Sequence, residues 1–241
     1  MSLTKEAIQH IQNTAIEPND RIVREDGRSF IIDNDGYRKE ITRRPTAKIT
    51  LNTLTSMVDF IKNIDFSDER KLYLKIDGPR EVYLISSLQD NNSRDILTTV
   101  EAILPSIQFD HFKDAEILVI ELQAKFLPTD DRETVLQVLG NLKEENVKNL
   151  GDDGVSQQVV IKQGVASATN VKVPNPVVLA PFRTFHEVKQ PESPFIFRMR
   201  EGGQGALFEA DGQGWKLAAI QNIKAFFEKE LAGLDNVVIL A

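Results

Sequence analysis

The chain contains no cysteine among its 241 residues. Disulfide bonds, thiolate nucleophiles and cysteine-ligated metal sites are therefore excluded, and the composition suits a reducing cytoplasm. Histidine is scarce as well. The three histidines, His10, His111 and His186, lie far apart, and none belongs to an HxH or HExxH pattern. The sequence therefore predicts no metal site.

Long hydrophobic runs are also missing. A membrane-spanning helix needs roughly 20 apolar residues, and the run Ile117–Ile120 is far too short. Met1–Ile16 is amphipathic and lacks the continuous apolar centre of a signal peptide. We therefore expect a cytoplasmic protein with no membrane partner.

The familiar catalytic and cofactor-binding motifs are absent. No glycine spacing ends in Gly-Lys-Ser/Thr, as a Walker A loop requires, and there is no nucleophile elbow. The glycines of 202–205 and 212–214 could cradle a phosphate, but neither group has the dinucleotide-binding spacing, so we interpret them as turns. The sequence predicts a protein that is not an enzyme, with no catalytic residue and no cofactor.

What remains is the composition of a folded protein. Hydrophobic residues make up 41% of the chain, which is ordinary for a globular domain. The net charge of -7 argues against nucleic acid bound uniformly over the surface, but it leaves room for a local basic patch.

The stretch Val173–Trp215 organises the C-terminal half. It holds five of the ten prolines and the only tryptophan. Because proline cannot donate to a sheet ladder, these prolines should lie between strands or at strand ends. Phe195–Arg200 alternates in the period-two pattern of a half-buried strand. We expect Phe195, Phe197 and Met199 to face the core.

Further strands and a helix complete this half. Phe182–Val188 is predicted as a strand, and Ala206–Ala210 as the return strand after a glycine-rich turn. From Trp215 a helix carries one apolar stripe. The stripe consists of Leu217, Ile220, Ile223, Phe227 and Leu231. We expect three antiparallel strands with this helix packed on one face.

The rest of the chain reads as helices and hairpins. Four helices are predicted, over Leu3–Ala15, from Asn52 to Ile64, over Ser93–Leu104 and over Thr129–Leu142. The expected N-terminal caps are Ser2 or Thr4 for the first helix, Asn52 for the second and Thr129 for the fourth. Strands are predicted over Arg21–Glu25, Arg28–Ile32, Tyr37–Arg43, Lys71–Ile76, Glu81–Ser86, Ala115–Ala124 and Val155–Gln163, several of them joined by Asp-Gly turns. Val237–Leu240 should form a short edge strand or one exchanged between copies.

These patterns predict an α+β fold with mostly antiparallel sheets, hairpins and several packed amphipathic helices. A chain of 241 residues is long enough for one large domain or two small ones. We predict a single domain over residues 1–241. The alternative is a division into two lobes, 1–145 and a β-rich 146–241, with the seam near Lys143–Gly154.

Charge is distributed unevenly along the chain. Between Tyr37 and Lys48 five bases stand against one acid, a local balance of 5 - 1 = +4. Between Thr129 and Gly154 three bases stand against seven acids, a balance of 3 - 7 = -4. The second segment is the acidic counterpart of the first.

Aromatic and basic residues interleave from Phe182 to Arg200. Platforms for single-stranded nucleic acid combine rings, on which bases stack for about 1–3 kcal/mol each, with cations that follow the phosphates. The plainer interpretation places the phenylalanines in a core and the arginines in solvent or against the acidic helix. Under the first interpretation, the candidate nucleic-acid-binding residues are Arg38, Lys39, Arg43, Arg44, Lys48, Arg183, His186, Arg198 and Arg200.

Three runs in the C-terminal half carry a resemblance: DDGVSQQVVIKQG, NPVVLAPFRTFHEVKQPESPFIFRMR and LFEADGQGW. They resemble the YfdQ-like phage and prophage proteins, in the variant common in phages of Gram-positive bacteria. The match covers about Asp152–Leu231, and the N-terminal half fits more loosely. The resemblance implies a phage or prophage protein of the bacterial host cytoplasm, often encoded among early recombination and replication genes. It implies no established activity.

Two functions stay open on the sequence. The first is a non-enzymatic accessory role in phage recombination or replication, with single-stranded nucleic acid as the partner. The second is self-assembly, or binding of a host protein in host takeover or anti-defence. It is motivated by the basic hairpin, the acidic segment and a C-terminal strand that could pair between copies.

Overall fold

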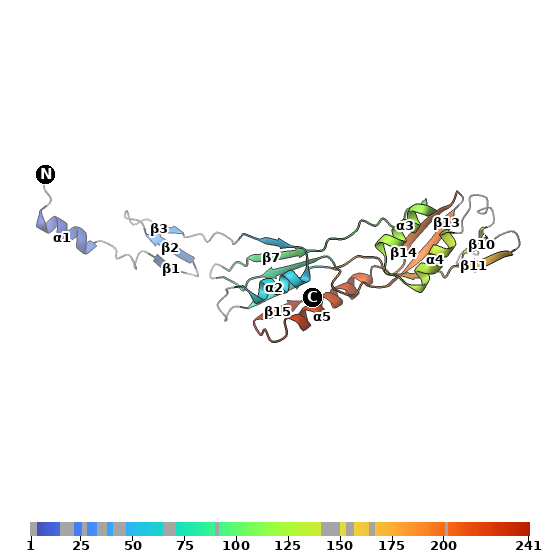
Figure 1. Ribbon diagram of the computed structural model, residues 1–241. Coiled ribbons are helices and arrows are strands. Elements are labelled where there is room, and N and C mark those ends of the chain that lie inside the picture. The colour runs from blue at the N-terminus through green and yellow to red at the C-terminus, as the bar shows by residue number, and fades with distance from the viewer. Residues whose placement is uncertain are drawn as a thin grey trace.

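The computed structural model describes residues 4–14, 22–25, 28–32, 38–40, 47–64, 71–89, 92–140, 150–152, 157–163, 167–200 and 202–241. These residues form five helices and 15 strands, arranged in four sheets (Figure 1). Most strand pairs are antiparallel, with β15–β5 and β4–β7 as the parallel pairs. The predicted α+β fold with hairpins is confirmed.

A five-stranded sheet forms what we call the first lobe. Its strands run in the order β15-β5-β6-β7-β4. Their bounds are β4 Ile49–Leu51, β5 Leu72–Ile76, β6 Glu81–Ile85, β7 Ile96–Glu101 and β15 Val237–Leu240. The predicted hairpin of β5 and β6 is therefore present. The C-terminal strand pairs with β5 of its own chain, as an edge strand.

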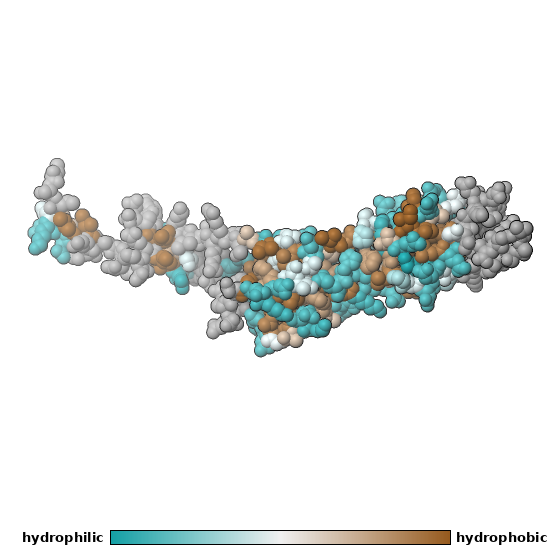
Figure 2. Space-filling model, viewed as in Figure 1, coloured by the Kyte–Doolittle hydropathy of each residue, from teal (hydrophilic) through white to brown (hydrophobic). Residues whose placement is uncertain are grey.

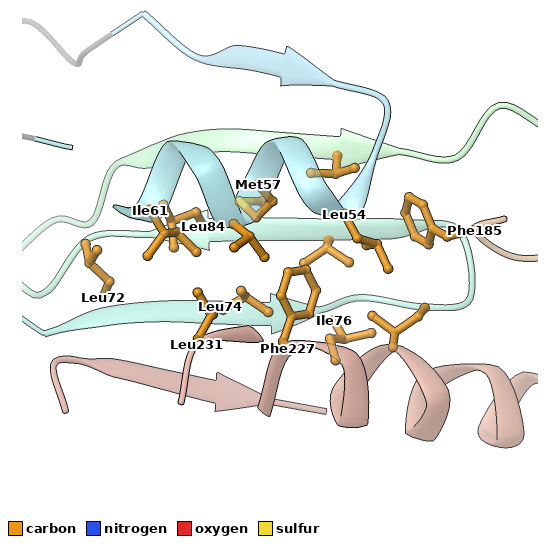
Figure 3. Close-up of a cluster of buried hydrophobic side chains, with 14 of the residues drawn as sticks. Leu54, Met57, Ile61, Leu72, Leu74, Ile76, Leu84, Phe185, Phe227 and Leu231 are labelled. Carbon is orange, nitrogen blue, oxygen red and sulfur yellow. The ribbon is translucent and has the colours of Figure 1, made fainter. Parts of the chain in front are cut away.

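Two helices, α2 (Leu54–Lys62) and α5 (Trp215–Glu230), pack on one face of this sheet (Figure 3). The register pairs Leu74 with Leu84 on β5 and β6, and both side chains are fully buried. Helix α2 begins one residue later than the expected Asn52 cap, because the hydroxyl of Thr53 accepts the hydrogen bond from the Ser56 amide at 3.2 Å.

A four-stranded sheet, in the order β12-β13-β14-β8, forms the second lobe. Its strands are β8 Lys113–Asp114, β12 Val177–Leu179, β13 Ser193–Arg200 and β14 Gln204–Glu209, all antiparallel. Helices α3 (Ala115–Lys125) and α4 (Asp130–Gly140) cover one face. Phe195, Phe197 and Met199 are buried against them, which confirms the period-two prediction for β13. Thr129 caps α4 as expected, since its hydroxyl accepts from the Arg132 amide.

The prediction of a central strand over Ala115–Ala124 is wrong, because this segment is α3. Leu118 and Leu122, four residues apart, face the core, whereas Ile117 and Ile120 are 51% and 57% exposed. Ile117–Ile120 is an unbroken apolar run. The helical spacing of the core-facing residues is therefore not visible in the sequence, because Ile117 and Ile120 are apolar although they face away from the core.

The prediction of a helix over Ser93–Leu104 is also wrong, because its centre is the strand β7. Thr98, Thr99 and Val100 are β-branched and fully buried, a composition that fits a central strand. β7 pairs with β6 on one side and with the distant β4 on the other. Pairing with residues so far away in sequence outweighs the local helical pattern.

Helix α5 begins at Trp215 as predicted but packs elsewhere. It was expected to cover the sheet that contains β13, whereas its buried Ile223 and Phe227 belong to the core of the first lobe. The expected stripe is shifted as well, since Leu217 is 69% exposed and Ala219 is buried. The helix therefore starts beside the second lobe and extends along the first.

The remaining elements are α1 Lys5–Thr14, β1 Ile22–Glu25, β2 Arg28–Ile32, β3 Arg38–Glu40, β9 Leu150–Asp152, β10 Gln157–Gln163 and β11 Ser167–Lys172. They confirm the N-terminal helix with its Thr4 cap, the N-terminal hairpins and the strand near Val155–Gln163. None of their described residues joins either core. No helix in the described part of the chain is long and apolar enough to cross a membrane.

The two cores do not divide at residue 146. The second core takes α3 and α4 from before that position together with β12–β14 from after it, and α5 and β15 return to the first core. The expected seam, Lys143–Gly154, lies largely outside the described residues. The chain thus crosses between the lobes more than once.

Gly205 of β14 allows close packing of α3 on the sheet. A Cβ atom there would lie 2.8 Å from Leu118 Cδ2 and 3.3 Å from a ring carbon of Phe197.

We expect Gly205→Ala to lower the free energy of unfolding by about 1–3 kcal/mol through overpacking. Urea denaturation followed by circular dichroism measures this. Gly140→Ala is the control and should cause no loss, because a Cβ added there would meet no atom within 4 Å outside its own helix backbone. Equal stability of the two variants would contradict the packing.

Candidate functional site

The four-stranded sheet has a second face that none of the described helices covers. Since α3 and α4 lie on the side of Phe195 and Phe197, alternate residues of β13 and β14 point the other way. We call this surface the open face. Its register pairs Ile196 with Phe208, Arg198 with Ala206 and Arg200 with Gln204. Ile196 and Arg200 are exposed, Arg198, Gln204 and Phe208 are half-buried, and Ala206 is buried.

A guanidinium and two rings form a cluster at one end of the open face. The Cζ atom of Arg200 lies 4.5 Å from the ring centroid of Phe112. That ring meets the ring of Phe208 edge-on, at 6.1 Å between centroids and an interplanar angle of 70°. Arg200 Nε donates to Gln204 Oε1 at 2.7 Å, which fixes the direction of the side chain.

This arrangement offers two chemical functions side by side. Phe208 and Phe112 present apolar ring surface, and Arg200 and Arg198 bring positive charge to the same face. A planar base can stack on such rings while a phosphate approaches the guanidinium groups. The open face therefore has the composition of a surface for single-stranded nucleic acid.

Arg183 does not belong to the open face. Its side chain is 2% exposed, and its terminal nitrogens donate to Glu209 Oε1 at 2.8 Å and to Ser193 Oγ at 2.5 Å. The guanidinium lies 4.1 Å above the ring centroid of Trp215. Burial lowers the pKa of Arg183, and the charges of Glu209 and Asp211 oppose that shift. The prediction that Arg183 contacts nucleic acid is therefore corrected to a structural role.

The segment Phe182–Gln190, predicted in part as a strand, is an irregular connection between the lobes, which we call the joint. The side-chain oxygen of Gln190 accepts from the backbone amides of Arg183 and Thr184, and its nitrogen donates to the carbonyl of Phe185 at 2.9 Å. One buried amide group thus satisfies backbone groups that a strand would pair with a neighbour.

The joint reaches into the first lobe at three points. Phe185 is buried in its core. The hydroxyl of Thr184 donates to the carbonyl of Pro79 at 2.5 Å. The carboxylate of Glu187 accepts from the amides of Leu54 and Thr55 at 2.9 and 2.8 Å, at the start of α2. These contacts fix the joint on both sides.

His186 also belongs to the joint. It is exposed, and its ring lies 5.0 Å from that of Phe182, centroid to centroid. Together with Phe185 and Glu187 it lines a small cavity of about 250 Å³. The structure therefore separates His186 from Arg198 and Arg200, with which the sequence grouped it.

The N-terminal candidates lie in another part of the chain. Arg38 of β3 is exposed and pairs with Glu25 of β1 at 2.6 Å. Lys48 is exposed just before β4. The side chain of Lys39, and Arg43 and Arg44 entirely, lie outside the described residues. Of the nine sequence candidates, only Arg198 and Arg200 share a described surface.

Carboxylates in the described part of the chain do not form a metal site: no three His, Asp or Glu residues gather there in a suitable cluster. The most enclosed carboxylate network is that of Glu121, which accepts from Lys113 at 2.5 Å and from Lys125 at 2.9 Å. Burial would raise the pKa of Glu121, but the hydrogen bonds and charges of the two lysines outweigh it and lower the pKa. This network therefore acts as an ion pair.

Two functional features escaped the sequence analysis. Phe112 precedes β8 in a segment without alternation, so no local pattern places it beside Arg200. Gln190 stands between Lys189 and Pro191, and nothing in this local sequence marks it as buried. Phe208 could have been found, because it alternates with buried Leu207 in a predicted strand.

Comparison with known proteins yields no match: no protein-family model fits the chain, and neither the curated proteins nor the solved structures contain a significantly similar one.

Proposed function

We propose that the chain is a phage or prophage accessory protein that binds single-stranded nucleic acid on the open face, without catalysing a reaction. The cluster of Arg200, Phe112 and Phe208 supports the proposal most directly, because it joins positive charge to aromatic surface on one side of a sheet. The resemblance of Asp152–Leu231 to YfdQ-like proteins supports the phage origin, the host cytoplasm and a role in recombination or replication.

The geometry also suggests how binding would proceed. Arg198 and Arg200 lie two residues apart on β13, so both can face one stretch of sugar-phosphate backbone. Phe208 lies across from Ile196, where a base could stack on the ring beside an apolar neighbour. Contacts of this kind read the backbone and the base surface rather than base edges, so the expected binding has little sequence preference.

The double variant Arg198→Ala/Arg200→Ala tests this proposal. Fluorescence anisotropy with a labelled oligothymidylate should show weaker binding at low salt. The slope of log K against log salt should fall by about 1.4, which is roughly 0.7 for each lost phosphate contact to a single strand. Phe208→Ala should lower the binding free energy by about 1–3 kcal/mol while the salt slope stays unchanged.

The matched control is Lys189→Ala/Lys229→Ala, which removes two exposed charges outside the open face, with side chains 76% and 83% exposed. It should bind as tightly as the unmodified chain. No binding at low salt, or equal losses in both double variants, would contradict the proposal.

Self-assembly is the second candidate function, and the N-terminal elements favour it. Ile8 and Ile11 of α1 are 46% and 55% exposed, and Ile22 and Ile31 of the three-stranded sheet β1-β2-β3 are 50% and 40% exposed. Figure 2 shows apolar residues on the surface of these elements. A ten-residue helix is marginal by itself in water, so packing of its apolar face against a second copy would stabilise it. The C-terminal strand no longer supports exchange, since it pairs within its own chain.

Mass photometry of the variant Ile8→Ser/Ile11→Ser tests this second function. We expect the unmodified chain to form assemblies at nanomolar to micromolar concentration and the variant to shift towards monomers. Gln9→Ser, also on α1, serves as control and should leave the mass distribution unchanged. A strictly monomeric unmodified chain would contradict self-assembly.

A further inference from the structure

A cavity of about 680 Å³ lies where the two lobes meet. Its wall is formed by the turn between β5 and β6, by the segment before β8, by Arg183 of the joint, by the end of β14 and by the first turns of α5. Sites for small molecules commonly enclose about 300–1,000 Å³. The cavity is thus large enough for a small organic ligand.

Each acidic side chain of the wall is already engaged. Asp77 forms an ion pair with Lys75, and Glu209 pairs with Arg183 at 2.8 Å. Glu81 accepts from the hydroxyl of Tyr83 at 2.5 Å, and this bond raises the pKa of Tyr83 to about 12. Each of these carboxylates therefore already accepts a hydrogen bond or an ion pair from a neighbouring side chain.

Two cations of the wall differ in this respect. Among the residues that the structure describes, neither Arg80 nor Lys216 has a carboxylate within ion-pair distance. Arg80 Nε makes only a long hydrogen bond, 3.4 Å, to the carbonyl of Arg183. Lys216 Nζ donates to the amide oxygen of Gln213 at 2.6 Å. Both cations keep donors for a further acceptor.

The wall also contains two buried donors that lack an acceptor among the described residues. Arg183 Nε and Trp215 Nε1 are buried, and neither has a hydrogen-bond partner in the described part of the chain. Buried donors without an acceptor are rare in folded proteins. The charge of Arg80 further lowers the pKa of Arg183, whose main cause of lowering is burial. An anion in the cavity would supply an acceptor for these donors and a countercharge for Arg80 and Lys216.

We propose that this cavity binds a small organic anion. Arg80 and Lys216 hold its carboxylate or phosphate oxygens through charge-assisted hydrogen bonds. Phe109 and Ile220, which line the same cavity, receive its apolar body. This site is separate from the open face, so it stands whether or not the open face binds nucleic acid.

Isothermal titration calorimetry with three probes of similar size tests the proposal: phenyl phosphate, phenylacetate and the neutral benzyl alcohol. We expect one or both anions to bind at micromolar to millimolar concentration and benzyl alcohol to bind more weakly. Binding of one anion and not the other would identify the preferred oxygen group. Arg80→Ala and Lys216→Ala should each weaken anion binding about tenfold, the effect of one lost charge-assisted hydrogen bond.

Two control variants separate this site from general electrostatics and from the open face. Lys189→Ala removes an exposed charge outside the cavity wall and should leave anion binding unchanged. Arg198→Ala/Arg200→Ala should do the same. The proposal is overturned if neither anion binds, if benzyl alcohol binds as well as the anions, or if Lys189→Ala weakens binding as much as Arg80→Ala. Thermal melting of each variant verifies that it is folded.

Discussion

A buried guanidinium holds the two lobes of this protein in place. Removing the charge of Arg183 from water is unfavourable unless the surroundings supply a countercharge and acceptors. Glu209 and Ser193 of the second lobe supply them, and the guanidinium carbon lies 4.1 Å from the ring centroid of Trp215 at the start of α5. Because α5 continues into the core of the first lobe, the position of this single side chain constrains both lobes together.

The joint around Arg183 extends this constraint. Gln190 binds the backbone of the joint internally, Phe185 fills the first core, and Glu187 completes the start of α2. An irregular segment is stable here because many of its backbone groups have hydrogen-bond partners and the side chains of Arg183, Thr184, Phe185 and Gln190 are buried. The joint contacts two parts of the cavity wall, because Thr184 donates to Pro79 in the β5–β6 turn and Arg183 lies over Trp215 in the first turn of α5.

The open face results from the alternation of side chains along β13. On β13, every second side chain packs under α3 and α4, so the intervening residues must face away from the core. This alternation places Arg198 and Arg200 on the same face of β13. The surface proposed for nucleic acid is thus a consequence of the strand's period, and Phe112 adds a ring that comes from outside the strand pair.

Local signals in the sequence predicted local structure well. The alternation of Phe195–Arg200, the Asp-Gly hairpins and the caps at Thr4 and Thr129 all depend on residues within a few positions of one another. The errors arise where distant residues decide. β7 is a strand because β4 and β6 pair with it, and α5 covers the first lobe because Phe227 fits that core. No local pattern distinguishes the buried Arg183 from the exposed Arg200, since the partners of Arg183 come from other elements.

Hydrogen exchange measured by mass spectrometry on Arg183→Met tests the central claim most directly. Methionine keeps much of the apolar volume but removes the charge and its donors. The account predicts faster exchange in the joint, in the β5–β6 turn and in the first turns of α5, with the helices α3 and α4 and the strands β6 and β7 unchanged. Arg198→Met, on the open face, should leave exchange in all these segments as it was. If Arg183→Met exchanged no faster than Arg198→Met at the joint, the guanidinium would not be what holds the lobes together.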